Sequence, residues 1–287
     1  MQQTFHTPNN WLDHRIRVLL LGAGGTGGEV LYALARLHTM LLEFGHVSGL
    51  HVTLMDGDTV SRANIGRQRF YRCDIGYPKA SVLIQRHNLA FMLDWRAVDQ
   101  NWTAKRGDGL WLGRYDLVIS CVDRAAVRVE LARAGRSLQV PLLWMDFGNG
   151  QHTGQCILGH LGGAAGSPAL RLPNVYDLYP ELVDVDDDAA PSCSSMEAIR
   201  HQDLFTNPLL AEAGISLLWK LMHTGSTTTH GVFIDAREPC VSGLPIDPDV
   251  WALYRADPTR RQRKKIGRRR RRRPTRRARA GSAAASR

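Results

Sequence analysis

The stretch RVLLLGAGGTGG, residues 17–28, decides the fold of this 287-residue chain. Its apolar run, 17–21, is typical of a strand buried on both faces of a parallel sheet. The pattern GxGxxG follows at 22–27, and apolar side chains recur at helical spacing over 29–44. A second apolar run, 51–55, ends in Asp56. Strand, glycine turn, helix and strand in this order predict a βαβ unit with a right-handed crossover.

The sequence beyond this unit continues the alternation of strands and helices. Apolar runs at 116–122 and 141–145 predict two further strands, and helical periodicity marks 78–91 and 125–135. After Asp146 the chain is extended and punctuated by turn residues, which indicates antiparallel strands at the sheet edge. We therefore expect an α/β fold: a Rossmann-like, doubly wound, mainly parallel sheet with added antiparallel edge strands.

The C-terminal part predicts a crossover loop followed by helices. Residues 162–192 are rich in Gly, Pro and Ala and carry the acidic run 184–188, which favours a loop with little regular structure. Ser194 and Glu197 have capping-box spacing and would open one helix. The apolar stretch 209–223, which stops before Gly225, predicts another.

The last 28 residues differ in composition from the rest of the chain. Residues 260–287 contain fifteen Lys or Arg and no acid. Without them the 37 basic residues of the chain fall to 22, against 27 Asp and Glu, so the net charge of +10 comes from this tail alone. Too few apolar side chains are available to offset the entropy of ordering, so we expect a disordered tail. It either contacts nucleic acid or another polyanion, or is a solvated extension.

Composition also indicates the cellular compartment of the protein. No charge-free apolar window of eighteen residues occurs, and the first fifteen residues lack the pattern of a secretory signal. We expect a soluble, cytoplasmic protein that makes no membrane contact. The five cysteines are scattered and form no CxxC pair, which argues against a disulfide framework or a zinc site.

The polar segment DGDTVSRANIGRQ, residues 56–68, indicates which class of ligand the glycine turn binds. Glycine turns of this kind let backbone N–H groups approach phosphates, but many dinucleotide oxidoreductases share them. Two carboxylates, an Asn, an Arg and a Gln within thirteen residues can together hold a ribose and a triphosphate. Lys79 adds a point charge for phosphate, and Asp123, at the end of a strand, adds a magnesium ligand. This set favours nucleotidyl transfer over hydride transfer.

These motifs resemble the superfamily of ThiF, MoeB and ubiquitin-activating enzymes. Its pattern is GxGGxG, then DxDxVxxxNxxRQ, a lysine, and a strand ending in CxD. The matching residues here are Gly22, Gly24, Gly25, Gly27, Asp56, Asp58, Val60, Asn64, Arg67, Gln68, Lys79, Cys121 and Asp123. The C-terminal sequence is also similar to the ThiF-family proteins of PRTRC gene cassettes.

The resemblance implies ATP-dependent adenylation of the C-terminal carboxylate of a small protein. Asp56 would bind the ribose hydroxyls; Asn64, Arg67, Gln68 and Lys79 would hold phosphates; and Asp123 would bind Mg²⁺. The partner would be a small ubiquitin-like or sulfur-carrier protein with a C-terminal Gly. We expect an adenylation domain over 1–259 that includes the crossover loop.

The resemblance raises three further expectations. Cys193, next to the Ser194 cap, could accept the activated carbonyl as a thioester or could be a structural cysteine. The two CxxC pairs that hold zinc in relatives are missing, so we predict no zinc. Relatives form dimers and borrow an arginine from the partner protomer. A homodimer is expected here, and Arg15 or Arg17 could supply that group.

Two other functions stay open from the sequence alone. An NAD- or FAD-dependent oxidoreductase would also have a glycine turn and an acid after the second strand. A non-catalytic nucleotide-binding module could be tethered to nucleic acid by the basic tail. ATP consumption separates the first from an adenylating enzyme, and deletion of the tail separates the second.

Overall fold

The computed structural model describes residues 1–104, 112–140, 142–162, 170–185, 187, 204–238 and 240–256. The strands are β1 (Phe5–His6), β2 (Ile16–Leu21), β3 (Leu50–Met55), β4 (Arg96–Val98), β5 (Leu117–Ser120), β6 (Leu143–Asn149), β7 (Thr153–His160), β8 (Ser226–Thr227), β9 (Thr229–Asp235) and β10 (Cys240–Pro245). The α-helices are α1 (Gly25–Glu43), α2 (Lys79–Phe91), α3 (Ala125–Gly135), α4 (Val175–Leu178), α6 (Thr206–Thr224) and α7 (Pro248–Ala256). Short 3₁₀ helices are η1 (Asn9–Trp11), η2 (Arg62–Asn64), η3 (Arg72–Asp74), η4 (Leu112–Arg114) and η5 (Pro180–Asp184).

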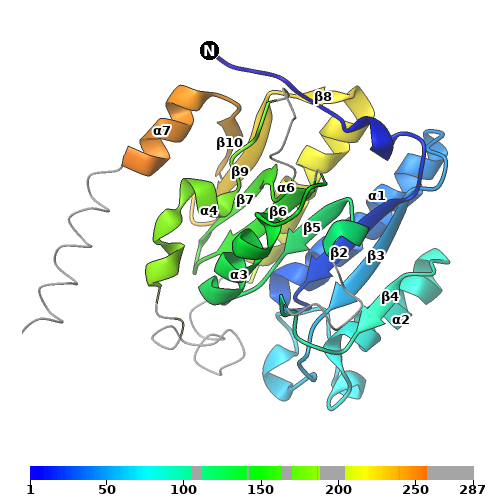
Figure 1. Ribbon diagram of the computed structural model, residues 1–287. Helices are drawn as coiled ribbons and strands as arrows, with labels where there is room; N and C mark the ends of the chain where they lie inside the picture. Colours follow the sequence, from blue (N-terminus) through cyan, green and yellow to red (C-terminus); the bar gives the residue numbers. More distant parts are fainter. Residues whose placement is uncertain are drawn as a thin grey trace, which may run out of the picture.

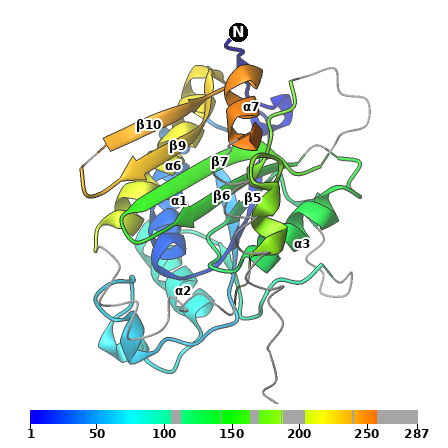
Figure 2. The ribbon, with the colours of Figure 1, turned by 90° about the vertical axis from the view of Figure 1, so that its left-hand side faces the viewer.

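One large sheet organises these elements, in the order β10-β9-β7-β6-β5-β2-β3-β4. The pairs from β6 to β4 are all parallel. β7, β9 and β10 continue the sheet as antiparallel strands, and they are visible at the near edge in Figure 2. The expected mainly parallel sheet with antiparallel additions is therefore confirmed.

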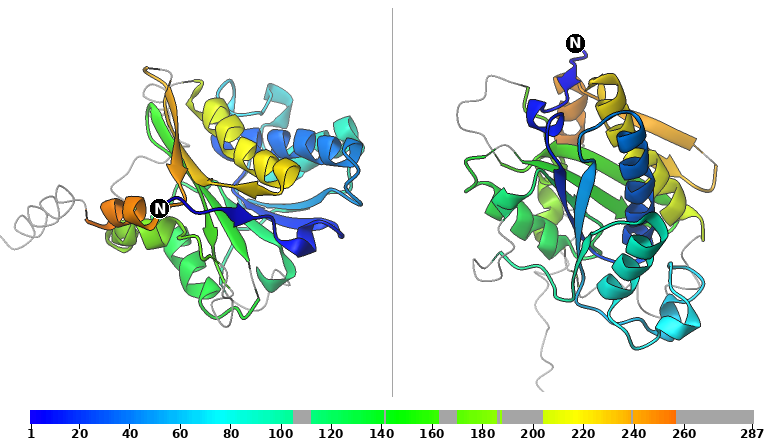
Figure 3. Two further views of the ribbon diagram at one scale, coloured as in Figure 1. Left: turned by 90° about the horizontal axis from the view of Figure 1, so that it is seen from above. Right: turned by 90° about the vertical axis from the view of Figure 1, so that its right-hand side faces the viewer.

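Helices cover both faces of the sheet (Figure 1). In the left view of Figure 3, α1 and α6 lie against one face while α3 and α4 lie against the other. α1 follows β2 and leads to β3 on one side, whereas β5 pairs with β2 on the other side. The strand order thus reverses beside β2, and ligands bind open α/β sheets at the carboxyl ends of such strands.

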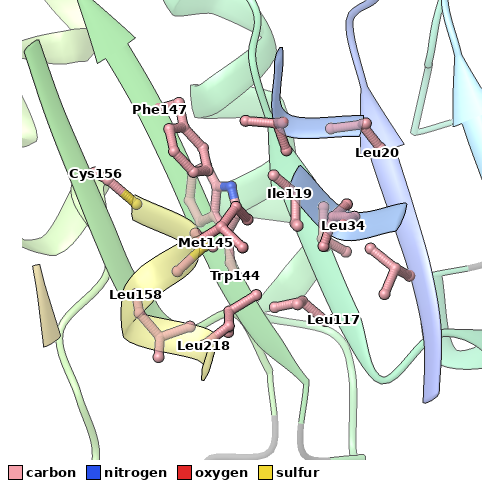
Figure 4. Close-up of a cluster of buried hydrophobic side chains, with 14 of the residues drawn as sticks. Leu20, Leu34, Leu117, Ile119, Trp144, Met145, Phe147, Cys156, Leu158 and Leu218 are labelled. Carbon is pink, nitrogen blue, oxygen red and sulfur yellow. The ribbon is translucent and has the colours of Figure 1, made fainter. Parts of the chain in front are cut away.

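The core forms where the sheet meets α1 and α6, as in Figure 4. The strand residues Leu20 and Ile119 are fully buried there, and so are Leu34 of α1 and Leu218 of α6. Burial on both faces explains why the central strands are continuous apolar runs rather than alternating ones. The apolar face of α6 lies within this core, so packing inside one protomer accounts for its hydrophobic character.

The structure corrects several predicted boundaries. α1 begins at Gly25, not near Glu29, so two glycines of the turn belong to its first helical turn. β6 runs on to Asn149, beyond the predicted end at Met145. The segment expected to lack regular structure contains α4 and η5, because Asn174 caps α4 by accepting hydrogen bonds from the N–H groups of Tyr176 and Asp177. β4, β9, β10 and α7 were not predicted.

Some predictions fall outside the described residues. These are the helix opened by Ser194 and Glu197, the thioester candidate Cys193, and the tail 260–287. No helix in the described ranges has the length and apolar character needed to cross a membrane.

Candidate functional site

In the glycine turn between β2 and α1, backbone atoms leave no room for a side chain at two positions. Gly22 has a φ of +94°, and a Cβ there would lie 2.5 Å from the carbonyl oxygen of Cys121. A Cβ on Gly27 would collide with the carbonyl oxygen of Gly22. Gly27 therefore allows α1 to start directly against the end of β2. Its role is in the packing of the turn, since it does not line the nucleotide-sized pocket described below.

The carboxyl end of β3 supplies two aspartates with different surroundings. Asp56 accepts hydrogen bonds from the N–H of Ala23 at 2.6 Å and the N–H of Asp58 at 2.8 Å. Its carboxylate thereby ties the glycine turn to the end of β3. Burial raises the pKa of Asp56 above its ordinary value, while these N–H groups and the charge of Lys79 oppose the rise.

Lys79 is held at the opening of α2 by the second aspartate. Its Nζ lies 2.8 Å from Oδ2 of Asp58, and the lysine side chain is 6% exposed while that of Asp58 is 61% exposed. The N–H of Lys79 also donates to the carbonyl of Asp58. Lysines are rarely buried to this degree unless they are paired, and Lys79 lines the pocket beside its partner Asp58.

The loop between Asp58 and Lys79 carries the other predicted phosphate ligands. Arg67 and Gln68 both line the pocket. The buried Oε1 of Gln68 has no hydrogen-bond partner within the part of the chain that the structure describes. Arg67 donates from Nε to the carbonyl of Ala63, 3.4 Å away, at the end of a loop that Gly66 turns with a φ of +89°.

Asn64, predicted to hold phosphate, occupies a different place. It is 1% exposed, and its Oδ1 accepts hydrogen bonds from the N–H and the hydroxyl of Ser61. This capping box opens η2 and shapes the loop that carries Arg67. Asn64 is not among the pocket-lining residues.

A pocket of about 630 Å³ lies where these elements meet, a size suited to a nucleotide. It brings together Gly22, Gly24, Gly25, Asp56, Asp58, Arg67, Gln68, Lys79 and Asp123 from the predicted set. Apolar side chains also line its wall: Leu21, Met55, Trp102, Val122 and Val127. The residues reach the pocket because parallel strands present their carboxyl ends at one edge of the sheet.

Sequence reasoning missed a group of pocket residues that hydrogen-bond to one another, namely Thr26, Asn149 and Asn207. Asn207, at the start of α6, accepts hydrogen bonds at Oδ1 from Thr26 of α1 at 3.0 Å and from Asn149 of β6 at 2.7 Å. A Cβ on Gly25 would collide with Nδ2 of Asn207, so that amide lies directly against the glycine turn. The residues TNP at 206–208 carry a helix-start signal, but nothing local indicates that α6 opens beside α1.

A buried ion pair lies behind the pocket. Arg128 of α3 donates from Nε to both carboxylate oxygens of Asp146, at 2.8 and 2.9 Å, and from Nη2 to the carbonyl of Phe147. Ser120 also donates to Asp146, and its hydroxyl in turn accepts from the indole N–H of Trp144. These bonds fix α3 to β5 and β6. Cys121 lies close by and lines the pocket; burial raises the pKa of its thiol well above the ordinary value, so it is protonated at neutral pH.

An exposed carboxylate at the pocket wall fits Mg²⁺. Asp123 is exposed at the pocket wall, whereas the carboxylate of Asp58 is paired with Lys79. Magnesium is commonly held by one or two carboxylates together with substrate phosphates and water, so a single carboxylate here fits the ion. No group of three or more His, Cys, Asp or Glu in the described ranges is arranged to hold a metal by itself.

The two arginines considered for a trans contact are paired within their own chain. Arg15 forms an ion pair with Asp94. Arg17 donates from Nε and Nη2 to Asp116 at 3.0 Å. Both lie at the amino end of β2, while the pocket lies at its carboxyl end.

Comparison with known proteins agrees with this architecture. PaaA is similar in structure, with a TM-score of 0.55 and 14% identity over 80% of this chain and 64% of its own. MccB of E. coli in a structure with ATP gives a TM-score of 0.54 and 16% identity, over 83% of this chain and 65% of its own. A structure of MccB with AMPCPP and MccA gives 0.54 and 17%, over 83% and 66%.

These likenesses show the fold, and this chain spans slightly less than two thirds of the length of those proteins. No curated protein sequence matched the chain. The family model described as "ThiF family" matches residues 13–264, which include every pocket residue named above. The chain therefore belongs to the ThiF family.

Proposed function

We propose that this protein uses ATP to adenylate the C-terminal carboxylate of a small partner protein. The observation that carries the proposal is one pocket in which a glycine turn, Arg67, Lys79 and Asp123 meet. Membership of the ThiF family supports an ATP-using adenylating enzyme of the ThiF and MoeB type. The printed description of MccB with AMPCPP and MccA supports a peptide or protein as the second substrate.

The reaction joins a carboxylate oxygen to the α-phosphorus of ATP. The new O–P bond forms as the bond between the α-phosphorus and the oxygen that bridges to the β-phosphorus breaks, and pyrophosphate leaves with that electron pair. No side chain has to act as a nucleophile. The protein contributes by holding both reactants and by placing positive charge where negative charge develops.

The polar residues and glycines of the pocket would each bind a different part of ATP. Asp56, already tied to the glycine turn, would accept hydrogen bonds from the ribose hydroxyls. The backbone at Gly24 and Gly25 would approach the phosphates at the amino end of α1. Arg67 and Lys79 would neutralise phosphate charge, and Lys79 would exchange part of its pairing with Asp58 for the phosphate.

Asp123 would hold Mg²⁺ with the phosphates. The ion would neutralise charge on the pyrophosphate leaving group. Gln68 extends the polar wall beside Arg67. Asn64 would act indirectly, by shaping the loop that carries Arg67.

The finer parts of the proposal concern the partner. A small ubiquitin-like protein with a C-terminal Gly, as in PRTRC cassettes, is the proposed substrate, and the adenylation domain is proposed to extend over 1–259. Transfer to Cys193 as a thioester, a homodimeric state and a cytoplasmic location are further proposals.

The experiment is ATP–pyrophosphate exchange with labelled pyrophosphate, ATP, Mg²⁺ and each candidate partner. Arg67→Ala should lower exchange by about 100-fold or more, because a cation aimed at the phosphates is lost. Arg36→Ala is the matched control, since Arg36 is paired with Glu212 on the surface and does not line the pocket. Normal exchange by Arg67→Ala would refute the assignment. Oxidation of a substrate with NAD, and no exchange, would favour an oxidoreductase.

A further inference from the structure

The first turn of α3 is capped by an acid distant in sequence. The carboxylate of Asp187 accepts hydrogen bonds from the N–H of Ala125 at 2.7 Å and the N–H of Ala126 at 2.9 Å. Arg124, the residue at the N-cap position, makes no side-chain capping bond. A residue 62 positions further along the chain therefore satisfies two of the N–H groups that a helix start leaves without helical partners.

This capped turn is part of the nucleotide pocket. Asp123, Arg124, Ala126 and Val127 all line the pocket. Asp123 and Arg124 are themselves exposed, so where their side chains lie depends on how the backbone of this turn is held. The proposed magnesium ligand precedes the first capped N–H by two residues.

The rest of α3 is anchored from the opposite side. Arg128, one turn on, is bonded to Asp146 and to the carbonyl of Phe147 in the core. Helix ends fray unless their free N–H groups are satisfied, and a carboxylate at the amino end also interacts favourably with the helix dipole. Asp187 and Arg128 thus fix the two sides of one helical turn, one from the surface and one from the core.

We propose that Asp187 is a positioning residue of the nucleotide site, which holds the Asp123–Arg124 turn at the pocket wall by capping α3. The inference rests on the proposed function in one respect, the binding of Mg²⁺ by Asp123. It makes this acid part of the machinery of adenylation, although Asp187 does not line the pocket.

Two variants and one matched control test this role in the full-length protein. Asp187→Ala removes both acceptor oxygens, and Asp187→Asn keeps one. Asn174→Ala is the control, because Asn174 caps α4 by accepting two backbone hydrogen bonds, and its side-chain amide donates to the carbonyl of His160 on β7.

The first measurement is amide hydrogen exchange at Ala125 and Ala126 in the nucleotide-free protein. Exchange there should be fastest in Asp187→Ala, intermediate in Asp187→Asn, and as in the unmodified protein for Asn174→Ala. The second measurement is the Mg²⁺ concentration that gives half-maximal ATP–pyrophosphate exchange. It should rise severalfold in Asp187→Ala, less in Asp187→Asn and not in the control, while the KM for ATP at saturating Mg²⁺ changes little.

The outcomes separate this inference from the proposed function. Faster hydrogen exchange with an unchanged Mg²⁺ requirement would overturn the positioning role and leave only a structural cap. Unchanged hydrogen exchange would overturn the capping contact itself. If the unmodified protein shows no pyrophosphate exchange with any partner, the proposed function fails; Mg²⁺-dependent ATP binding by calorimetry then decides the positioning role, with the same order of variants expected.

Discussion

At the scale of single residues, the glycines of the turn are required for different physical reasons. Gly22 and Gly27 are required by the backbone, because a Cβ at either position would strike a carbonyl oxygen. Gly25 is required by the amide of Asn207. Around Gly24, nothing in the described residues lies within 4 Å of where a Cβ would be, and this glycine lines the pocket. One sequence motif thus combines folding constraints with a constraint that belongs to the ligand.

Alanine substitutions should separate these two kinds of constraint. Gly27→Ala should destabilise the protein by several kcal/mol, about the size expected for overpacking a tight backbone contact. Gly24→Ala should leave the free energy of unfolding within about 0.5 kcal/mol of that of the unmodified protein, yet weaken ATP binding at least tenfold because its methyl group faces the phosphates. Urea unfolding and calorimetric titration with ATP are the measurements. Equal loss of stability in both variants would contradict this division.

At the scale of elements, α7 is joined to the sheet through a buried histidine. His230 of β9 is 0% exposed; its Nδ1 lies 2.8 Å from the carbonyl of Leu158 on β7, and its Nε2 lies 2.8 Å from Nε1 of Trp251 on α7. The indole can only donate and the carbonyl can only accept, so His230 is neutral with its proton on Nδ1. Burial lowers the pKa of His230 to about 4.

This pairing predicts a dependence of stability on pH. The folded pKa of about 4 lies below the ordinary value of 6.5, so the unfolded chain binds the proton more readily. The contribution of His230 is complete above pH 6.5 and is lost as the pH falls from there towards 4, by up to about 3 kcal/mol. His160 shifts in the same direction, also to about 4, and adds to the slope.

Urea unfolding between pH 7.5 and pH 4.5 checks this prediction. His230→Gln should be less stable at neutral pH, but its stability should fall less steeply with acid than that of the unmodified protein. His223→Gln, which removes an exposed imidazole, is the matched control. An identical slope in His230→Gln and the unmodified protein would contradict the role given to His230.

At the scale of the whole molecule, the described part of the pocket is separated in sequence from the basic tail. Its lining residues lie between Leu21 and Asn207, while the basic tail starts at Arg260. Deleting 260–287 should therefore leave ATP–pyrophosphate exchange within about twofold of the full chain, a difference below about 0.5 kcal/mol. Any affinity for polyphosphate or DNA should fall, and should be salt-dependent in the full chain. Loss of exchange on deletion would contradict this prediction and give the tail a part in catalysis. A full chain that shows no exchange but loses its cellular function with the tail would support the tethered, non-catalytic alternative.

The sequence by itself determined the central βαβ unit and the motif residues that line the pocket. Apolar periodicity locates buried strands and helix faces, and polar residues at the ends of parallel strands must converge at one edge of the sheet. Asp56, Arg67, Lys79 and Asp123 could be placed together for that reason. Asn64 shows the limit of this reasoning, because a residue in the motif can serve the loop itself rather than the pocket.

Only the tertiary structure decided the contacts that cross between distant elements. Asn207 lies against the glycine turn and Asp187 caps α3 because of the order of strands in the sheet and the faces on which α6 and α3 pack. Such order is set by the packing of the whole core, to which every strand and helix contributes. Local patterns carry no information about it, since they report which face of an element is buried but not which neighbour covers it.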